Sequence, residues 1–486
     1  MKFILAILIC VAVCQARPQN DDHRHHDHTE YNKSAPCVGK CSEPGPVTFH
    51  MAQVKKLKEK AYAECHAEGK CPLNEPSIRQ RSPCVDGKSA GQYECSNVDM
   101  MSYVSLRDMG SSGDGNDIWG WTDEPEPGVR FEYAIVGTHD GTSFVDVTNA
   151  EDPTVLGFLP THTRNSMWRD VKVYENHAFI VSEASDHGMQ VFNLLRLRQR
   201  PPAGTVPRLK ADAHYGKVGN AHNIVINEET GYAYIVGSEQ YWHLEYIPCA
   251  GGLHIVDIRE PLSPRFLACY GRDYYTHDAQ CVIYHGPDVR YYGNEICFAY
   301  NENTLTIIDV TNKKNMVMLS RTKYKNVAYT HQGWLTEDHA YLISNDELDE
   351  KYGKVQHTRS LLWDVKNLQA PVHYSSFMST EKAIDHNLYI RGNLAYETNY
   401  CAGLRILDIT DMAEGAEQVR EVAYFDVAPD WDSVSFHGSW SSYPFFESGN
   451  VIVSSIERGL FVLRPNHEAI KRLQEEAKLK RKAISH

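Results

Sequence analysis

The pattern of apolar and polar residues changes at about residue 100, where short apolar runs begin to alternate with polar turns. One kind of run ends in Asp or just after it, as in TSFVDV, GLHIVDI, TLTIIDV, SLLWDV and GLRILDI. A second kind closes on polar residues, as in HAFIVSE, YAYIVGSE, ICFAYNE, HAYLISND, NLAYETN and NVIVSSIE. Apolar runs of this length between turn residues predict β-strands. The chain beyond this point is therefore expected to be all-β.

These strands recur in a unit of nearly constant length. The residues that open successive units are Asp117, Asp170, His222, His277, His331, His386 and His437, spaced 53, 52, 55, 54, 55 and 51 residues apart. A β-rich unit that repeats with this period is typical of a β-propeller, in which each unit forms one four-stranded blade. We therefore predict a seven-bladed β-propeller over residues 98–465.

The two ends of the repeat region complete the expected fold. The last unit supplies only three strands, and the strand-like run Tyr103–Leu106 lies upstream of the first unit. We expect this run to be the outer strand of the last blade, since closing the ring hides exposed sheet edges. Residues 466–486 begin with Asn466 as a helix N-cap and carry apolar residues at helical spacing, which predicts a C-terminal helix.

The N-terminal residues predict export. Residues 1–16 contain one Lys, an apolar run and a small-residue exit at Ala16, the features of a cleaved signal peptide. No later apolar stretch is long enough to span a bilayer, so we expect a secreted, extracellular protein. Residues 17–35 include DDHRHHDH and are predicted to be a disordered His-rich tail. Asn32 begins a glycosylation sequon in this tail, which predicts a glycoprotein.

The cysteine spacing predicts a disulfide-bonded segment between the tail and the propeller. Of the 13 cysteines, Cys10 and Cys14 leave with the signal peptide, and six others fall within residues 36–97. In an oxidising compartment this density indicates a small cysteine-rich disulfide module. Six cysteines allow many pairings, so the connectivity is open. A zinc site at CVGKC is the alternative interpretation. The odd number of remaining cysteines leaves one thiol free or paired between chains.

Composition limits the partners. With 42% hydrophobic and 23% charged residues the chain has an ordinary globular composition. The formal net charge of −14 argues against nucleic acid or an anionic membrane as the main partner. We expect no nucleic acid and no membrane insertion. The remaining candidates are a small molecule, another extracellular protein or a glycan.

Several motifs carry a family resemblance. They include NDIWGWTD, VGTHDGTSFVDVTNAEDP and the repeated strands LHIVDI and LRILDI. With these motifs the chain resembles the secreted choice-of-anchor B proteins, whose propeller is built from LVIVD-type repeats. The resemblance covers roughly residues 100–465 and leaves out the cysteine-rich segment. It implies the propeller fold and secretion, but no common reaction.

The histidines at the start of the repeats are candidate metal ligands. The innermost strands of a propeller all begin at the same end of the central channel, so equivalent residues should form a ring around the axis. The expected ligands are His222, His277, His331, His386 and His437. Converging imidazoles suit a divalent transition metal, here Fe, Cu, Mn or Zn. Asp170 and Asp117 in the other two blades, and Asp278 beside His277, are candidate catalytic acids or bases.

A second set of carboxylates is expected to support these imidazoles. The second strand of each blade runs back toward the same end of the channel, where it places Glu183, Glu239, Glu302, Asp346, Glu397 and Glu457. A carboxylate that accepts the far ring N–H fixes the tautomer and directs the other nitrogen inward.

Two functions remain open from the sequence. The first is a metal-dependent oxidoreductase or lyase with an axial metal site. The alternative is a non-catalytic extracellular binding or matrix protein, in which each His is a structural hydrogen-bonding strut. The Asp residues in two of the seven repeats favour the metal site, since a strut position should retain His.

Overall fold

The computed structural model describes residues 37–41, 50–71, 75–238 and 249–484. The expected signal peptide 1–16, the His-rich tail 17–35, the sequon at Asn32 and Glu239 lie outside the described residues. Within the described residues, no helix is long and apolar enough to cross a membrane.

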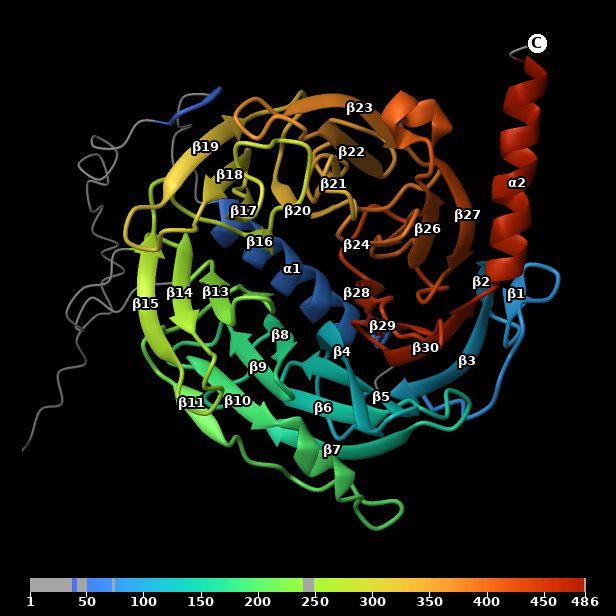
Figure 1. Ribbon diagram of the computed structural model, residues 1–486. Helices are drawn as coiled ribbons and strands as arrows, with labels where there is room; N and C mark the ends of the chain where they lie inside the picture. Colours follow the sequence, from blue (N-terminus) through green and yellow to red (C-terminus); the bar gives the residue numbers. More distant parts are fainter. Residues whose placement is uncertain (1–36, 42–49, 72–74, 239–248, 485–486) are drawn as a thin grey trace, which may run out of the picture. The chain divides into compact units, whose positions relative to one another are not determined.

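Seven antiparallel sheets follow one another around a central channel, which confirms the predicted seven-bladed β-propeller (Figure 1). The first three blades are β4 (Gly115–Glu126), β5 (Val129–Thr138), β6 (Gly141–Asp146), β7 (Thr154–Pro160); β8 (Arg169–Tyr174), β9 (His177–Ser182), β10 (Met189–Asn193), β11 (Ala213–Tyr215); and β12 (Asn223–Asn227), β13 (Tyr232–Val236), β14 (Leu253–Asp257), β15 (Arg265–Tyr270). The next three are β16 (Asp278–Ile283), β17 (Glu295–Tyr300), β18 (Leu305–Asp309), β19 (Val317–Thr322); β20 (Thr330–Leu335), β21 (Tyr341–Asp346), β22 (Arg359–Asp364), β23 (Val372–Met378); and β24 (Asn387–Arg391), β25 (Leu394–Thr398), β26 (Leu404–Asp408), β27 (Arg420–Phe425).

The seventh blade joins the two ends of the propeller. It consists of β28 (Ser439–Tyr443), β29 (Val451–Ser455), β30 (Gly459–Pro465) and β3 (Val98–Ser105). β3 pairs antiparallel with β30, with Tyr103 opposite Phe461. The Tyr103 hydroxyl also donates a hydrogen bond to the Arg458 carbonyl at 2.9 Å. This pairing closes the ring and removes the edge that β30 would otherwise expose.

The core lies between the faces of neighbouring blades. Each sheet is covered on both sides, so the strand LHIVD (Leu253–Asp257) is buried at every position. Burial on both faces explains why such strands read as continuous apolar runs instead of alternating ones. Ile255 of one blade packs in the same cluster as Ile308 of the next.

Ten cysteines form five disulfides between residues that are close in sequence. The pairs are Cys37–Cys41, Cys65–Cys71, Cys84–Cys95, Cys249–Cys269 and Cys281–Cys297. Cys37 and Cys41 of CVGKC bond each other, so the zinc alternative has no thiolates there. Cys401 is free and buried. Short strands β1 (Lys88–Ser89) and β2 (Tyr93–Ser96) extend the sixth blade, where β2 pairs with β27.

The helix α1 (His50–Ala67) was not expected from the sequence and lies across the central opening of the ring in Figure 1. Its buried residues recur at helical intervals and form one face, made of Met51, Val54, Lys58, Tyr62 and Cys65. This amphipathic spacing was readable in the sequence. The six cysteines around it favoured a loop-rich module instead.

The remaining helices are peripheral. The C-terminal helix α2 (His467–Ile484) confirms the predicted one, and Asn466 Oδ1 caps it by accepting a hydrogen bond from Ala469 N at 3.1 Å. Ile470 packs into the core cluster of the sixth and seventh blades. The described residues also include the short 3₁₀ helices η2 (Leu194–Arg198), η3 (Met412–Glu414) and η4 (Ala416–Gln418).

Candidate metal centre

Four of the five predicted histidines form an arc at one end of the channel. The ring centroids are 4.1 Å apart for His222 and His277, 4.2 Å for His277 and His331, and 4.4 Å for His331 and His386. All four side chains are buried. They meet because each stands at the start of the inner strand of its blade, and neighbouring inner strands contact one another around the channel.

Backbone hydrogen bonds orient two of these rings. Nδ1 of His277 donates to the carbonyl oxygen of His331 at 2.9 Å, and Nδ1 of His386 donates to the carbonyl oxygen of Trp440 at 2.7 Å. Each bond joins the inner strands of adjacent blades, as a structural strut would. It also fixes the tautomer and leaves Nε2 with a free lone pair, which is the state of a metal-binding imidazole. Nε2 of His277 has no hydrogen-bond partner within the described residues.

The charge state of the arc follows from its burial. Burial lowers the pKa of His331 to about 4. It lowers the pKa values of His277 and His386 well below the ordinary value, and neighbouring imidazoles add to the effect. These rings are therefore neutral at neutral pH.

Glu347 is the central carboxylate of this end of the channel. Its Oε1 lies 3.6 Å from Nε2 of His386, and its Oε2 lies 3.8 Å from Nε2 of His331. His331, Glu347 and His386 are all buried and offer three ligand atoms within 4.8 Å of one another. Oε2 of Glu347 has no hydrogen-bond partner within the described residues. The three residues could hold a metal ion.

Sequence reasoning missed Glu347, although a signal for it existed. Glu183 follows directly after the strand that ends at Ser182, and Glu347 follows directly after the strand that ends at Asp346. The two glutamates are 164 residues apart, which equals three repeats. The expected carboxylate, Asp346, directly precedes Glu347 in the chain.

The helix α1 places Lys58 beside Glu347. Nζ of Lys58 lies 2.6 Å from Oε1 of Glu347, and the Tyr400 hydroxyl donates to that oxygen at 2.5 Å. The ammonium group also lies 5.0 Å from the centroid of the Trp440 ring. Burial opposes ionisation of Glu347, but Lys58 and the neighbouring imidazoles of His331 and His386 together outweigh it and hold the pKa of Glu347 below its ordinary value. Glu347 is thus a carboxylate with a lysine as counterion.

His437 does not extend the arc, which corrects the five-histidine ring. Its ring stacks on Trp431 at 3.8 Å, and its Nδ1 lies 2.9 Å from Oε1 of Glu457. Trp440 takes the next place in the arc, with its ring 5.2 Å from that of His386. The last interval of 51 residues is short, and a full repeat after His386 ends near Trp440.

Asp117 and Asp170 do not lie in the histidine arc. The expectation that they occupy the equivalent positions of the other two blades was therefore wrong. Nζ of Lys172 lies 2.5 Å from Oδ1 of Asp170 and 3.3 Å from Oδ2 of Asp117. Oδ2 of Asp170 accepts the Ile224 N–H at 2.7 Å, a contact to the next inner strand. Burial raises the pKa of Asp117. Burial also opposes ionisation of Asp170, but Lys172 and the hydrogen bonds from Asp117 and the Ile224 N–H together outweigh it and lower that pKa. The two aspartates are tied into an ion-pair network.

The expected supporting carboxylates divide into two groups. Oε1 of Glu183 lies 2.6 Å from Nδ1 of His222, so Glu183 and Glu457 each contact an imidazole. The other described members bond elsewhere: Glu302 accepts from Met51 N, Asp346 from the backbone of Ala328 and Tyr329, and Glu397 from the Ser360 hydroxyl. A shift of one or two residues at a strand end changes the direction of the side chain, which explains the difference.

A cavity of about 370 Å³ lies further along the same inner strands. One side is aromatic, with Trp119, Trp334, Tyr389, Tyr443 and Phe445. These rings contact one another edge to face, as Trp334 and Tyr389 do at 5.0 Å. Nζ of Lys172 lies 4.7 Å from the centroid of the Trp119 ring.

Asp278 lines this cavity instead of joining the imidazole arc. Its Oδ1 accepts a hydrogen bond from Ala279 N at 2.7 Å, and burial raises its pKa to about 7. Glu228 and Glu229 also line the cavity and are exposed to solvent. Lys172 is the only cationic side chain among the described residues of the lining.

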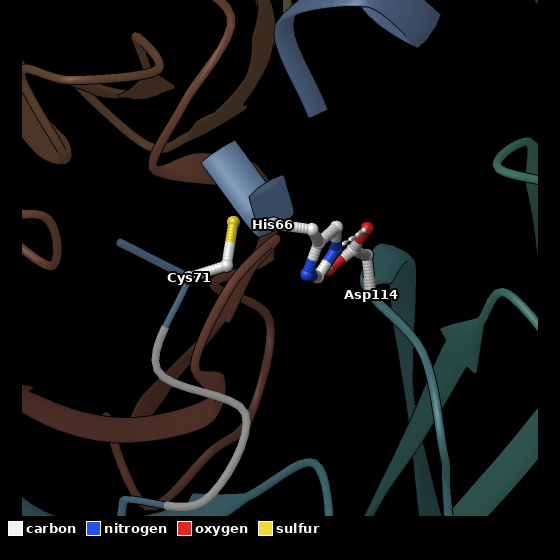
Figure 2. Close-up of side chains that lie close together, drawn as sticks. All are labelled: His66, Cys71 and Asp114. Atoms are coloured by element: carbon white, nitrogen blue, oxygen red, sulfur yellow. Dashed lines mark hydrogen bonds and ion pairs between the residues drawn. The ribbon is translucent and has the colours of Figure 1, made fainter. Parts of the chain in front are cut away.

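A further group, His66, Cys71 and Asp114, has ligand atoms close enough to suggest a metal site. Figure 2 shows the His66 ring facing the Asp114 carboxylate, with Cys71 set apart. Nε2 of His66 lies 2.9 Å from Oδ2 of Asp114, whereas Cys71 is bonded to Cys65. A disulfide sulfur is not a thiolate ligand, so the contact that remains is a hydrogen bond between His66 and Asp114, which links the end of α1 to the loop before β4.

Comparisons with known proteins identify one repeat of the chain. Residues 285–323 match a family model described as the LVIVD repeat. No curated protein matches the chain. A functionally unknown protein from Desulfotomaculum acetoxidans is 14% identical, with 67% of this chain and 89% of that chain covered and a TM-score of 0.43. The computationally designed Ika8 protein is 10% identical, with 79% and 99% covered and a TM-score of 0.43. The chain is a seven-bladed repeat propeller that contains an LVIVD repeat.

Proposed function

We propose that this protein binds one divalent transition metal in the propeller channel, between His331, His386 and Glu347. The observation that carries the proposal is the convergence of two imidazole Nε2 atoms, 3.6 and 3.8 Å away, on one buried carboxylate. Two neutral imidazoles and a carboxylate suit Fe, Cu, Mn or Zn, whereas Ca²⁺ and Mg²⁺ prefer oxygen ligands alone. Oε2 of Glu347, unpartnered within the described residues, is the first contact we assign to the ion.

Lys58 supplies the positive charge at Glu347 in the structure described here. A divalent cation at Oε2 and the ammonium group at Oε1 compete for the charge of one carboxylate, so metal binding weakens the contact between Lys58 and Glu347. The helix α1 is then a cover over the metal centre. A bound metal would supply redox or Lewis-acid chemistry, and an oxidoreductase or lyase activity is part of this proposal.

Secretion and family membership belong to the same proposal. Five disulfides suit an oxidising compartment, which supports export by the predicted signal peptide. The LVIVD repeat supports assignment to the choice-of-anchor B proteins. Glycosylation at Asn32 follows from export and remains a prediction.

The test is elemental analysis of the secreted protein, purified without chelators or a His tag. We expect about one transition-metal ion per chain in the parent and less than about a tenth of that in His331→Ala/His386→Ala. The matched control is His437→Ala, which removes a buried imidazole outside the arc and should retain the metal. Circular dichroism and the melting temperature establish that each variant is folded. A metal-free parent that cannot be loaded with Fe, Cu, Mn or Zn would overturn the proposal in favour of struts.

The second candidate function is binding of an organic amine in the aromatic cavity. Its carboxylates, Asp278, Glu228 and Glu229, outnumber its one lysine, and aromatic faces attract organic cations. Calorimetry with choline and with its neutral isostere 3,3-dimethyl-1-butanol separates charge from shape. We expect choline to bind at least about tenfold more tightly, and Trp334→Ala to abolish the difference. Equal binding of the two probes, or none, would exclude this function.

A further inference from the structure

Three carboxylates outside the histidine arc lie close together beside the fifth blade. Asp349 and Glu350 lie in the connection between β21 and β22, and Asp385 lies directly before His386. They offer three oxygens within 4.8 Å of one another. All three side chains are buried, with exposed fractions of 0%, 4% and 2%. Buried carboxylates at this separation repel one another unless a cation or protons lie between them.

Hydrogen bonds and an ion pair from outside the cluster reach Asp385 and Asp349 but not Glu350. The oxygens of Asp385 accept the N–H groups of Asp346 at 3.0 Å and of Arg359 at 3.1 Å. Asp349 forms an ion pair with the Arg359 guanidinium. Neither oxygen of Glu350 receives a hydrogen bond from a described residue outside the cluster, and its carboxyl group lies against those of Asp349 and Asp385. A buried carboxylate with two bare oxygens is costly, so its position facing Asp349 and Asp385 points to a ligand.

Local cations do not neutralise the cluster. Arg359 is the one cationic side chain with an ion pair to it in the described part of the chain. The nearest lysines in the same connection point elsewhere, because Lys351 donates to the Val434 carbonyl and Lys354 to the Val327 carbonyl. One guanidinium therefore faces three buried carboxylates, a deficit that one divalent cation would correct.

We propose that Asp349, Glu350 and Asp385 bind a Ca²⁺ ion. The ligand atoms are all carboxylate oxygens, with no imidazole or thiolate, which excludes a preference for the softer transition metals. Ca²⁺ accepts irregular oxygen sites completed by water, whereas Mg²⁺ requires a near-ideal octahedron. The site is chemically distinct from the histidine arc, so the two centres bind different ions.

The ion would tether the two backbone segments that carry the metal centre. Asp349 lies two residues after Glu347, and Asp385 is the neighbour of His386. Ca²⁺ bound between them would fix the β21–β22 connection to the segment before β24. Its role is therefore structural support of Glu347 and His386, and its loss should loosen this blade first.

The test uses the full secreted protein, freed of bound ions with EGTA and returned to buffer with 5 mM CaCl₂ or 5 mM MgCl₂. This concentration exceeds the dissociation constants of extracellular calcium modules, which reach about 1 mM. We expect one Ca²⁺ per chain by equilibrium dialysis with ⁴⁵Ca. Ca²⁺ should raise the melting temperature by about 1–3 °C, and Mg²⁺ should have much less effect. No Ca²⁺ uptake and no shift in the wild type would overturn the proposal.

Two conservative variants make the test specific. Glu350→Gln and Asp385→Asn keep the side-chain size and should each weaken Ca²⁺ binding at least about tenfold. Glu476→Gln, which removes the same charge from an exposed position on α2, should bind as the wild type does. His331→Ala/His386→Ala should retain Ca²⁺, which separates this site from the histidine arc. If Glu350→Gln is more stable than the wild type and Ca²⁺ has no effect on either, protons hold the cluster together and the proposal is wrong.

Discussion

Lys58 and Glu347 form an ion pair with 2.6 Å between Nζ and Oε1, and their side chains are only 1% and 0% exposed. The two residues are 289 positions apart and come from different parts of the fold. Lys58 belongs to the helix that crosses the channel, and Glu347 belongs to the fifth blade. This contact makes α1 a component of the channel, since the helix supplies the counterion for a carboxylate that faces two imidazoles.

The first prediction concerns this ion pair. Lys58→Met keeps the length of the side chain but leaves Glu347 as a buried charge without a counterion. We expect the free energy of unfolding in metal-free buffer to fall by about 3–5 kcal/mol. Lys58→Met/Glu347→Gln should recover most of that loss, because it removes both charges. Urea unfolding of the two single variants and the double variant measures the coupling. Additive effects would contradict a direct interaction.

The second prediction concerns competition for Glu347. Because Lys58 and the metal compete for the charge of Glu347, Lys58→Met should bind a transition metal at least about tenfold more tightly than the wild type. Competition titrations with a chromophoric chelator measure the two affinities. Lys351→Met, which removes an exposed lysine that contacts the Val434 carbonyl, is the control. Weaker binding by Lys58→Met would mean that the lysine supports the site and does not compete for it.

The third prediction concerns acid stability. Burial lowers the pKa values of His187 and His254 to about 3, and the charge of Arg169 adds to the effect on His187. Unfolded histidine takes up a proton near pH 6.5, so the stability that these groups contribute is complete above that pH. It falls as pH decreases toward 3, by up to about 1.4 kcal/mol per pH unit for each group.

Urea unfolding at pH 7.0, 6.0 and 5.0 tests this dependence. His254→Gln cannot titrate, and its amide oxygen can accept the hydrogen bond that the Tyr215 hydroxyl now donates at 2.8 Å. The variant should lose less stability than the wild type below pH 6.5, by about 1.4 kcal/mol per pH unit. Identical slopes would show that His254 remains unprotonated in both folded and unfolded states or titrates equally in both.

The fourth prediction concerns thiols. Of 13 cysteines, ten are in disulfides, and Cys10 and Cys14 lie in the predicted signal peptide, so the processed chain should carry one thiol, Cys401. Burial raises the pKa of Cys401 to about 12, so the native protein should not react with Ellman's reagent. Unfolding in guanidinium without reductant should release one thiol per chain. Three thiols would indicate that residues 1–16 are retained.

The sequence predicted the propeller because blade formation depends on a local and repeated property. Each repeat carries apolar strands of similar length. The strands Leu253–Asp257 and Leu404–Asp408, for example, are buried at every position. The repeat spacing then sets the number of blades. The convergence of His222, His277, His331 and His386 follows from the same pseudo-symmetry, so it too was predictable.

The sequence did not predict the residues that complete the centre. Repeat length locates equivalent positions in two blades only to within one to three residues. A shift of one residue in a strand, however, moves a side chain to the other face of the sheet. That tolerance placed Asp117, Asp170 and His437 in the arc and selected Asp346 in place of Glu347. Lys58 belongs to no repeat, so no periodic argument could bring it to the channel.

The amino-acid sequence by itself determined the strands, the number of blades and the end of the channel at which imidazoles gather, since these depend on hydrophobic periodicity and repeat length. Only the tertiary structure decided which carboxylate faces those imidazoles and which charge neutralises it. The reason is that contacts such as Lys58 to Glu347 join segments far apart in the chain, and their geometry depends on side-chain direction and packing across the whole ring.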